Sequence, residues 1–321
     1  MTAQPFELQI EVRREDVLID STPATLAACS EDVRFRAVLE GRSPNDGRIP
    51  DYEVIPHFTS EGPPAVTELS LMHKGQCLGR YDREVWAAQA RAQIHALVEA
   101  QRLCRGDTVQ WKIVARPDPS RPSRFAARVQ LAPYPFEDRA LPDAVGGTVS
   151  AEVHAPLLDE IRRRVVESST VEIGGFLLGR LLRDPARGVG RIEVVDWLES
   201  PAGESGASSV HFSFGPRSFL AARERARRRD EGIVGWFHSH PSCPACGEPE
   251  NAGCQTHTLF FSADDKLVHA AGFSSAHMVA LVAGKVREAP ATRPEFGLYG
   301  WSEGRIVERP FRLIHLSPEG T

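Results

Sequence analysis

Two histidines one residue apart follow an apolar stretch of the chain, in the run His238-Ser239-His240-Pro241. The preceding residues, Gly232–Phe237, form a short apolar run that predicts a buried strand. Side chains two positions apart on a strand point to the same side, so both imidazoles would lie together at the strand end. Two neutral imidazoles, one carboxylate and an open water position make a catalytic zinc site. The carboxylate would come from the downstream segment Ser262–Asp265.

A single glutamate, Glu172, stands in an apolar, glycine-rich run that ends at Gly179. The order of this glutamate, His-x-His-Pro and Ser-x-x-Asp resembles the signature of the JAMM (MPN+) zinc metalloprotease family, in its bacterial, deubiquitinase-like form. The resemblance covers residues from about 148 to 308. It implies an α+β or α/β fold, with a mixed, curved sheet flanked by helices. The gap between the second histidine and the serine is longer than usual in that family, so residues 242–261 form an insertion.

The resemblance implies which side chains would bind the catalytic zinc. His238, His240 and Asp265 occupy the ligand positions of the family signature. Asp264 stands beside Asp265 and is the alternative carboxylate. The Ser-x-x-Asp spacing favours Asp265.

Two further residues would act on the substrate. Glu172 would be the general base that takes a proton from the attacking water and returns it to the leaving amine. A pKa raised by partial burial would suit that task. Ser262 would donate its hydroxyl to the oxyanion of the tetrahedral intermediate. Ser262 and Asp265 also fit a helix-capping box, which is compatible with both roles.

The insertion contains three cysteines and a histidine with the spacing of metal ligands. Cys243 and Cys246 form a Cys-x2-Cys pair, and Cys254 and His257 follow as Cys-x2-His. This two-plus-two arrangement predicts a second, structural zinc, which would supply the folding energy that so short and polar a segment lacks. A redox cysteine pair and a loop without metal are the alternatives, and His269 is another candidate for the fourth ligand.

Composition limits the class of protein. With 321 residues the chain is too long for one ordinary core, so two domains are expected. A formal net charge of −5 argues against a nucleic-acid partner. No apolar run approaches the roughly 20 residues of a membrane helix, and the N-terminus lacks the basic start and apolar core of a signal peptide. Together with the clustered cysteines, this predicts a cytoplasmic protein without a membrane association.

The chain is expected to divide into an α+β domain at residues 1–132, a linker at 133–147 and the metalloprotease-like domain at 148–321. In the first domain, alternation of apolar and polar residues predicts a strand at Val33–Leu39. A helix is expected from Asp82, as its N-cap, to about Cys104. The role of this domain stays open between recognition of a partner or substrate and dimerisation.

Alternating strands and helices are expected around the histidines in the second domain. The helices are Pro156–Glu167, Pro216–Asp230 and one that starts near Ser262; the strands are those containing Glu172 and the two histidines, Arg191–Leu198, Ser209–Phe214, Met278–Val282 and Phe296–Trp301.

JAMM enzymes hydrolyse amide or isopeptide bonds at the C-terminal tail of ubiquitin or ubiquitin-like proteins. The resemblance therefore implies a zinc-dependent (iso)peptidase that deconjugates or matures such a protein, in a bacterial conjugation system. Its partners would be the ubiquitin-like protein, its conjugates and conjugation enzymes. Two alternatives stay open: processing of a sulfur-carrier protein tail, and an inactive scaffold subunit. An inactive subunit would have lost signature residues, whereas this chain keeps all five.

Overall fold

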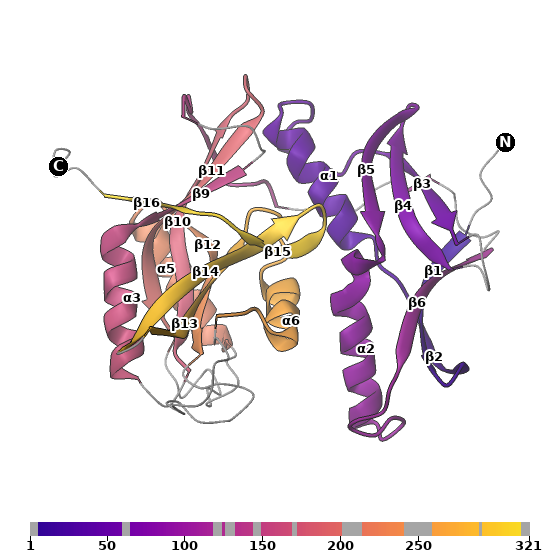
Figure 1. Cartoon of the computed structure of the whole chain (residues 1–321). Helices are drawn as coiled ribbons and strands as arrows, with labels where there is room; N and C mark the ends of the chain where they lie inside the picture. The colour runs from indigo at the N-terminus through magenta and orange to yellow at the C-terminus, as the bar shows by residue number, and fades with distance from the viewer. Residues whose placement is uncertain are drawn as a thin grey trace. The chain divides into compact units, whose positions relative to one another are not determined.

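The computed structural model describes two compact units of the chain (Figure 1). The first consists of residues 1–38, 43–133 and 302–305, and the second of residues 39–42, 134–301 and 306–321. Whether the first unit folds independently, as the sequence predicts, stays a prediction. None of the helices described is long and apolar enough to cross a membrane. The described residues are 6–59, 65–117, 124–125, 132–143, 149–168, 172–200, 214–240, 259–288 and 291–315.

The described part of the first unit contains two antiparallel sheets, ordered β2-β1-β6 and β5-β4-β3-β7, and helical segments. Its buried core combines Leu8 and Ile10 of the first sheet with Leu69 and Leu71 of the second. The strands are β1 (Phe6–Arg14), β2 (Val17–Pro23), β3 (Tyr52–Phe58), β4 (Val66–His73), β5 (Gln76–Asp82), β6 (Gln110–Pro117) and β7 (Arg124–Phe125). The helices are α1 (Ala27–Leu39), the 3-10 turn η1 (Arg83–Trp86) and α2 (Ala87–Glu99).

Helix α1 shows that the strand predicted at Val33–Leu39 is wrong. The prediction assumed that the arginines between the apolar residues face solvent. Instead Arg34 is only 2% exposed and donates to the backbone carbonyl of Ala132. Arg36 forms an ion pair with Asp32 at 2.9 Å, one turn earlier on the same helix. Because these cations find partners inside the protein, the apolar–polar alternation did not mark a solvent-facing side.

The second unit is built on a nine-stranded mixed sheet, ordered β15-β14-β13-β12-β10-β11-β9-β16, with β8 paired to β10. Pairs β12/β13 and β9/β11 are parallel, whereas β10 is antiparallel to both β11 and β12. The mixed α/β architecture expected from the sequence is therefore confirmed. The strands are β8 (Phe136–Asp138), β9 (Val149–His154), β10 (Gly174–Asp184), β11 (Val189–Glu199), β12 (Gly232–His240), β13 (Val279–Glu288), β14 (Ala291–Ser302), β15 (Arg305–Arg309) and β16 (Arg312–Ile314).

The described residues form three helices beside this sheet: α3 (Ala155–Glu167), α5 (Pro216–Arg228) and α6 (Ala263–Gly272). Helix α3 packs on β9 and β11, and α5 packs on β10 and β12. Strand β12 lies inside the sheet between β10 and β13 (Figure 1). All its residues from Val234 to His240 are buried, which explains why it has a continuous apolar run. The two histidines thus lie at the end of a strand whose side chains are buried on both faces of the sheet.

Two segments differ from the sequence-based expectation. Glu172 precedes strand β10 by two residues and is not part of the strand. In the segment expected to be a linker, β8 pairs with β10, and Tyr134 and Leu141 are buried, at 4% and 1% exposure. These apolar side chains attach it to the second unit. Of the strand expected at Ser209–Phe214, all but the last residue lies outside the described part of the chain.

Close backbone approach makes Gly179 a sensitive position in the sheet. It lies at a register shift between β10 and β11, and a Cβ there would meet the carbonyl oxygen of Glu193 at 1.8 Å. Gly179→Ala should therefore lower the free energy of unfolding by about 2 kcal/mol or more, measured in urea. The control is Gly272→Ala, where the nearest atom to the new Cβ is Phe219 Cζ at 3.8 Å. Equal stabilities of the two variants would contradict this packing.

Candidate metal centre

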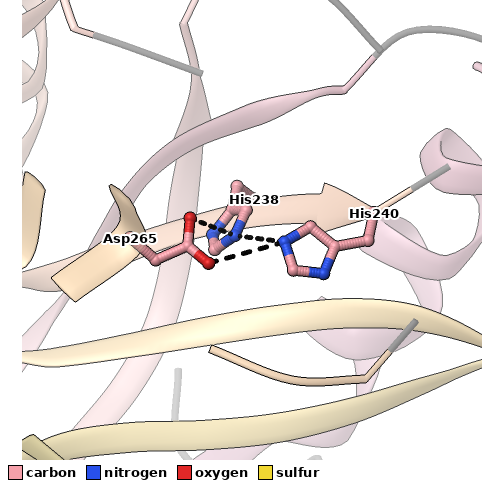
Figure 2. A group of neighbouring side chains, drawn as sticks. All are labelled: His238, His240 and Asp265. Atoms are coloured by element: carbon pink, nitrogen blue, oxygen red, sulfur yellow. Dashed lines mark hydrogen bonds and ion pairs between the residues drawn. The ribbon is translucent and has the colours of Figure 1, made fainter. Parts of the chain in front are cut away.

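Three potential metal donors converge at the end of β12 (Figure 2). The Nε2 atoms of His238 and His240 are 2.9 Å apart. Asp265 places Oδ1 at 3.1 Å from Nε2 of His238 and Oδ2 at 3.6 Å from Nε2 of His240. Around a tetrahedral zinc with ligand bonds of about 2.0–2.1 Å, donor atoms lie about 3.3 Å from one another. The observed separations fit a single metal ion bound by these three residues.

The first turn of α6 fixes the carboxylate. Ser262 is the N-cap, and its Oγ accepts the backbone N–H of Asp265 at 3.0 Å. In return, Oδ2 of Asp265 accepts the backbone N–H of Ser262 at 2.7 Å. The predicted capping box is therefore present, and it leaves Oδ1 close to His238. Asp264, the alternative carboxylate, is exposed and is not part of the donor cluster.

The electrostatics of His238 and Asp265 favour the protonation states that bind a metal. Burial lowers the pKa of His238, which keeps its imidazole neutral. For Asp265, burial alone would raise the pKa, but the neighbouring imidazoles outweigh it and hold the pKa well below its usual range. Neutral histidines and an ionised carboxylate are the forms that coordinate zinc.

Glu172 is held beside this cluster by the backbone of its neighbour. Ile173 donates its N–H to Ser239 Oγ at 3.0 Å, and its carbonyl accepts the N–H of Ser239 at 2.8 Å. Burial raises the pKa of Glu172 to about 7, against the opposing effect of His240. A carboxyl group with such a pKa can both accept and return a proton near neutral pH.

Ser239 is a residue whose part in the site the sequence-based interpretation missed. It lies between the two histidines, so its side chain points to the opposite side of β12. It is fully buried, and its hydroxyl ties the chain before β10 to the histidine strand. The available signal was a small polar residue between the two histidines, directly after the apolar run.

The raised pKa of Glu172 should appear in the stability of the metal-free protein. The carboxyl group of Glu172 has a pKa of about 7 in the folded protein, against an ordinary value of 4.5. Between these two pH values the group is protonated in the folded protein and ionised in the unfolded chain. The free energy of unfolding should thus fall as pH rises from about 4.5 to 7, by up to about 3 kcal/mol, since each pKa unit is worth about 1.4 kcal/mol.

Glu172→Gln isolates this contribution, because other titrating groups affect both proteins equally. Urea unfolding of chelator-treated protein at several pH values should give curves that diverge across the window, with the variant retaining its stability toward pH 8. Parallel curves would show that Glu172 is not buried as described.

The structure does not place every predicted ligand. Cys243, Cys246, Cys254 and His257 lie outside the described residues, so the structural zinc site stays a prediction. His269, the other candidate for its fourth ligand, is fully buried, and its Nδ1 accepts a hydrogen bond from Trp236 at 3.0 Å. That nitrogen is therefore already used within the core of the second unit.

Comparison with known proteins identifies a related family for part of the chain. Residues 154–249 match the family of prokaryotic homologs of the JAB domain, JAB being another name for the MPN or JAMM domain. This segment is a JAB-type domain. The JAB segment includes Glu172, His238 and His240, and it ends before Ser262 and Asp265. The resemblance seen in the sequence is thereby confirmed.

A curated relative and a solved structure are also similar to the chain. Over 82 residues the chain is 37% identical to the desampylase of Pyrococcus furiosus. The aligned segment covers 25% of this chain and 49% of that protein. The chain thus spans about half the length of the curated relative that it matches. The solution structure of a protein from Desulfitobacterium hafniense is 21% identical, covering 52% of this chain and 92% of that chain, with a TM-score of 0.35.

Proposed function

We propose that this chain is a zinc-dependent peptidase or isopeptidase that cleaves after the C-terminal tail of a ubiquitin-like protein. The observation that carries the proposal is the convergence of two buried imidazoles and one ionised carboxylate beside a buried glutamate with a pKa near 7. The JAB-type segment and the similarity to a desampylase support the class of substrate. Deconjugation and maturation are both compatible with this site.

In this proposal His238, His240 and Asp265 hold the metal. Zinc bound there would polarise the scissile carbonyl and make the attacking water more acidic. Glu172 takes one proton from that water as the C–O bond forms, and delivers it to the amine nitrogen as the C–N bond breaks. Ser262 stabilises the oxyanion: its Oγ accepts the N–H of Asp265, so the hydroxyl proton stays available to donate.

The direct test is hydrolysis by the purified full-length protein. The probes are ubiquitin-like proteins from bacteria and archaea that carry a C-terminal aminomethylcoumarin amide, together with the same proteins joined to lysine through an isopeptide bond. Cleavage after the tail should disappear with a zinc chelator and return when zinc is added. Absence of cleavage of every probe, in protein that contains zinc at the histidine site, would contradict a peptidase and favour an inactive subunit.

The metal content should be about two zinc ions per chain. The reason is that the sequence contains two independent ligand sets, the histidine–aspartate cluster and the cysteines of the insertion. Elemental analysis of the purified protein measures this number. A variant with Cys243→Ser and Cys246→Ser should lose one equivalent and keep the other. A content near one in the wild type, unchanged in that variant, would reject the structural site.

A further inference from the structure

Among the described residues, none forms a hydrogen bond with the second ring nitrogen of His238, the bond that usually orients a metal-binding histidine. Such a histidine normally donates its second ring N–H to a carboxylate, a backbone carbonyl or water, which fixes the plane of the ring. Here Nδ1 of His238 is buried, and within the described part of the protein it has no hydrogen-bond partner. Its Nε2 faces the donor cluster. The contacts made by the faces of the ring therefore bear on its orientation.

The indole of Trp236 lies flat against this imidazole. Their ring centroids are 4.6 Å apart, and the planes differ by 15°. Trp236 is two residues earlier on β12, so both side chains project from the same side of the strand. The indole is only 1% exposed, and Phe273 stacks on it with a centroid separation of 5.7 Å. This stacking restricts rotation of the His238 ring about its bond to the backbone.

A hydrogen bond donated to helix α6 keeps the indole in this position. Nε1 of Trp236 donates to Nδ1 of His269 at 3.0 Å. His269 is fully buried, and burial lowers its pKa to about 3, so it stays a neutral acceptor. It lies one helical turn after Asp265, on the same face of α6. One face of this helix therefore carries a metal donor and the group that anchors the indole.

We infer that Trp236, anchored by His269, is the positioning residue that fixes the ring plane of His238 in the metal centre. Helix α6 then sets two of the three donors, Asp265 directly and His238 through His269 and Trp236. This inference rests on the proposed metal function and goes beyond it, because neither Trp236 nor His269 belongs to the family signature. Neither residue touches the metal or the substrate.

Cobalt binding tests this inference without an activity assay. After the protein is stripped of zinc, it is titrated with Co2+, and the visible bands of the histidine–aspartate site are followed. A cysteine site is recognised separately, by its thiolate charge-transfer band. His269→Phe keeps an aromatic ring but removes the acceptor, and Trp236→Phe keeps a ring on His238 but removes the donor. His269→Asn is the matched control, since its amide oxygen can take the place of Nδ1.

His269→Phe and Trp236→Phe should each weaken Co2+ binding by about tenfold and change the visible bands, as expected when the support of a ligand is lost. The double variant should be no weaker than either single one, because both remove the same hydrogen bond. His269→Asn should bind like the wild type. Thermal unfolding identifies a variant that fails to fold. If one of the two phenylalanine variants does so, the Co2+ affinity of the other one tests the inference.

Wild-type affinity in both phenylalanine variants would overturn the inference. A His269→Asn variant as weak as His269→Phe would also overturn it, because a packing role alone would then explain the loss. If the wild-type histidine–aspartate site itself takes up no Co2+, the proposed metal function fails, and this inference fails with it. Normal uptake by the wild type separates the two cases.

Discussion

Glu172→Gln should lower the turnover of any confirmed substrate by about 10²–10⁴-fold, the usual contribution of a general acid–base group. The amide cannot take a proton from the attacking water, yet it fills nearly the same volume as the carboxyl group. Because Glu172 is outside the donor cluster, zinc content should stay at the wild-type value. Initial rates with saturating substrate, together with elemental analysis on the same sample, measure both quantities.

Glu167→Gln is the matched control for this variant. Glu167 lies at the end of α3 and is exposed, and its carboxylate pairs with Arg163 and Arg164 on the same helix. Surface pairs of this kind contribute little to stability, so this variant should keep full activity. If Glu172→Gln hydrolyses substrate as fast as Glu167→Gln, Glu172 is not the base, and the proton-transfer route proposed above is wrong.

The raised pKa also predicts how activity depends on pH. A base with a pKa of about 7 in the metal-free protein would be ionised only above neutral pH. A bound zinc cation would favour the carboxylate and lower that pKa. The acid limb of the pH–rate profile should therefore lie below pH 7 and disappear in Glu172→Gln.

Much of the site could be predicted from the sequence because its positions are set by local structure. The spacing of His238 and His240 puts both on one side of a strand, whatever the rest of the fold does. The Ser-x-x-Asp pattern of Ser262 and Asp265 is itself a helix start, and the capping box forms within one turn. Only the approach of that helix to the strand end required the tertiary structure.

What the sequence could not provide depends on contacts between distant segments. Helix α1 does not follow the strand pattern of its sequence because Arg36 pairs with Asp32, and Arg34 donates to a carbonyl far along the chain. Trp236 and His269 are 33 positions apart, and no pattern in either element indicates that they meet. Each looks like an ordinary core or helix residue until β12 and α6 are packed together.

The two adjacent carboxylates Asp264 and Asp265 should differ sharply in their contribution to zinc affinity. Asp265→Asn should reduce zinc affinity by more than about 100-fold, since it alters a direct ligand, whereas supporting residues already cost about 10–100-fold. The amide oxygen can still accept the N–H of Ser262, so the start of α6 should remain intact. Without the anionic charge, the two imidazoles are left as the remaining protein donors of the cluster. Activity should disappear at ordinary zinc concentrations.

Asp264→Asn is the matched control, because the residue lies on the same helical turn but is exposed and outside the donor cluster. Zinc affinity, measured by competition with a chromophoric chelator, should be unchanged in this variant and sharply reduced in Asp265→Asn. The reverse pattern would mean that the helix start is rotated relative to the histidines, and that Asp264 is the ligand. Equal, wild-type affinities in both would remove the carboxylate from the metal centre altogether, leaving two imidazoles that could not alone account for a catalytic zinc.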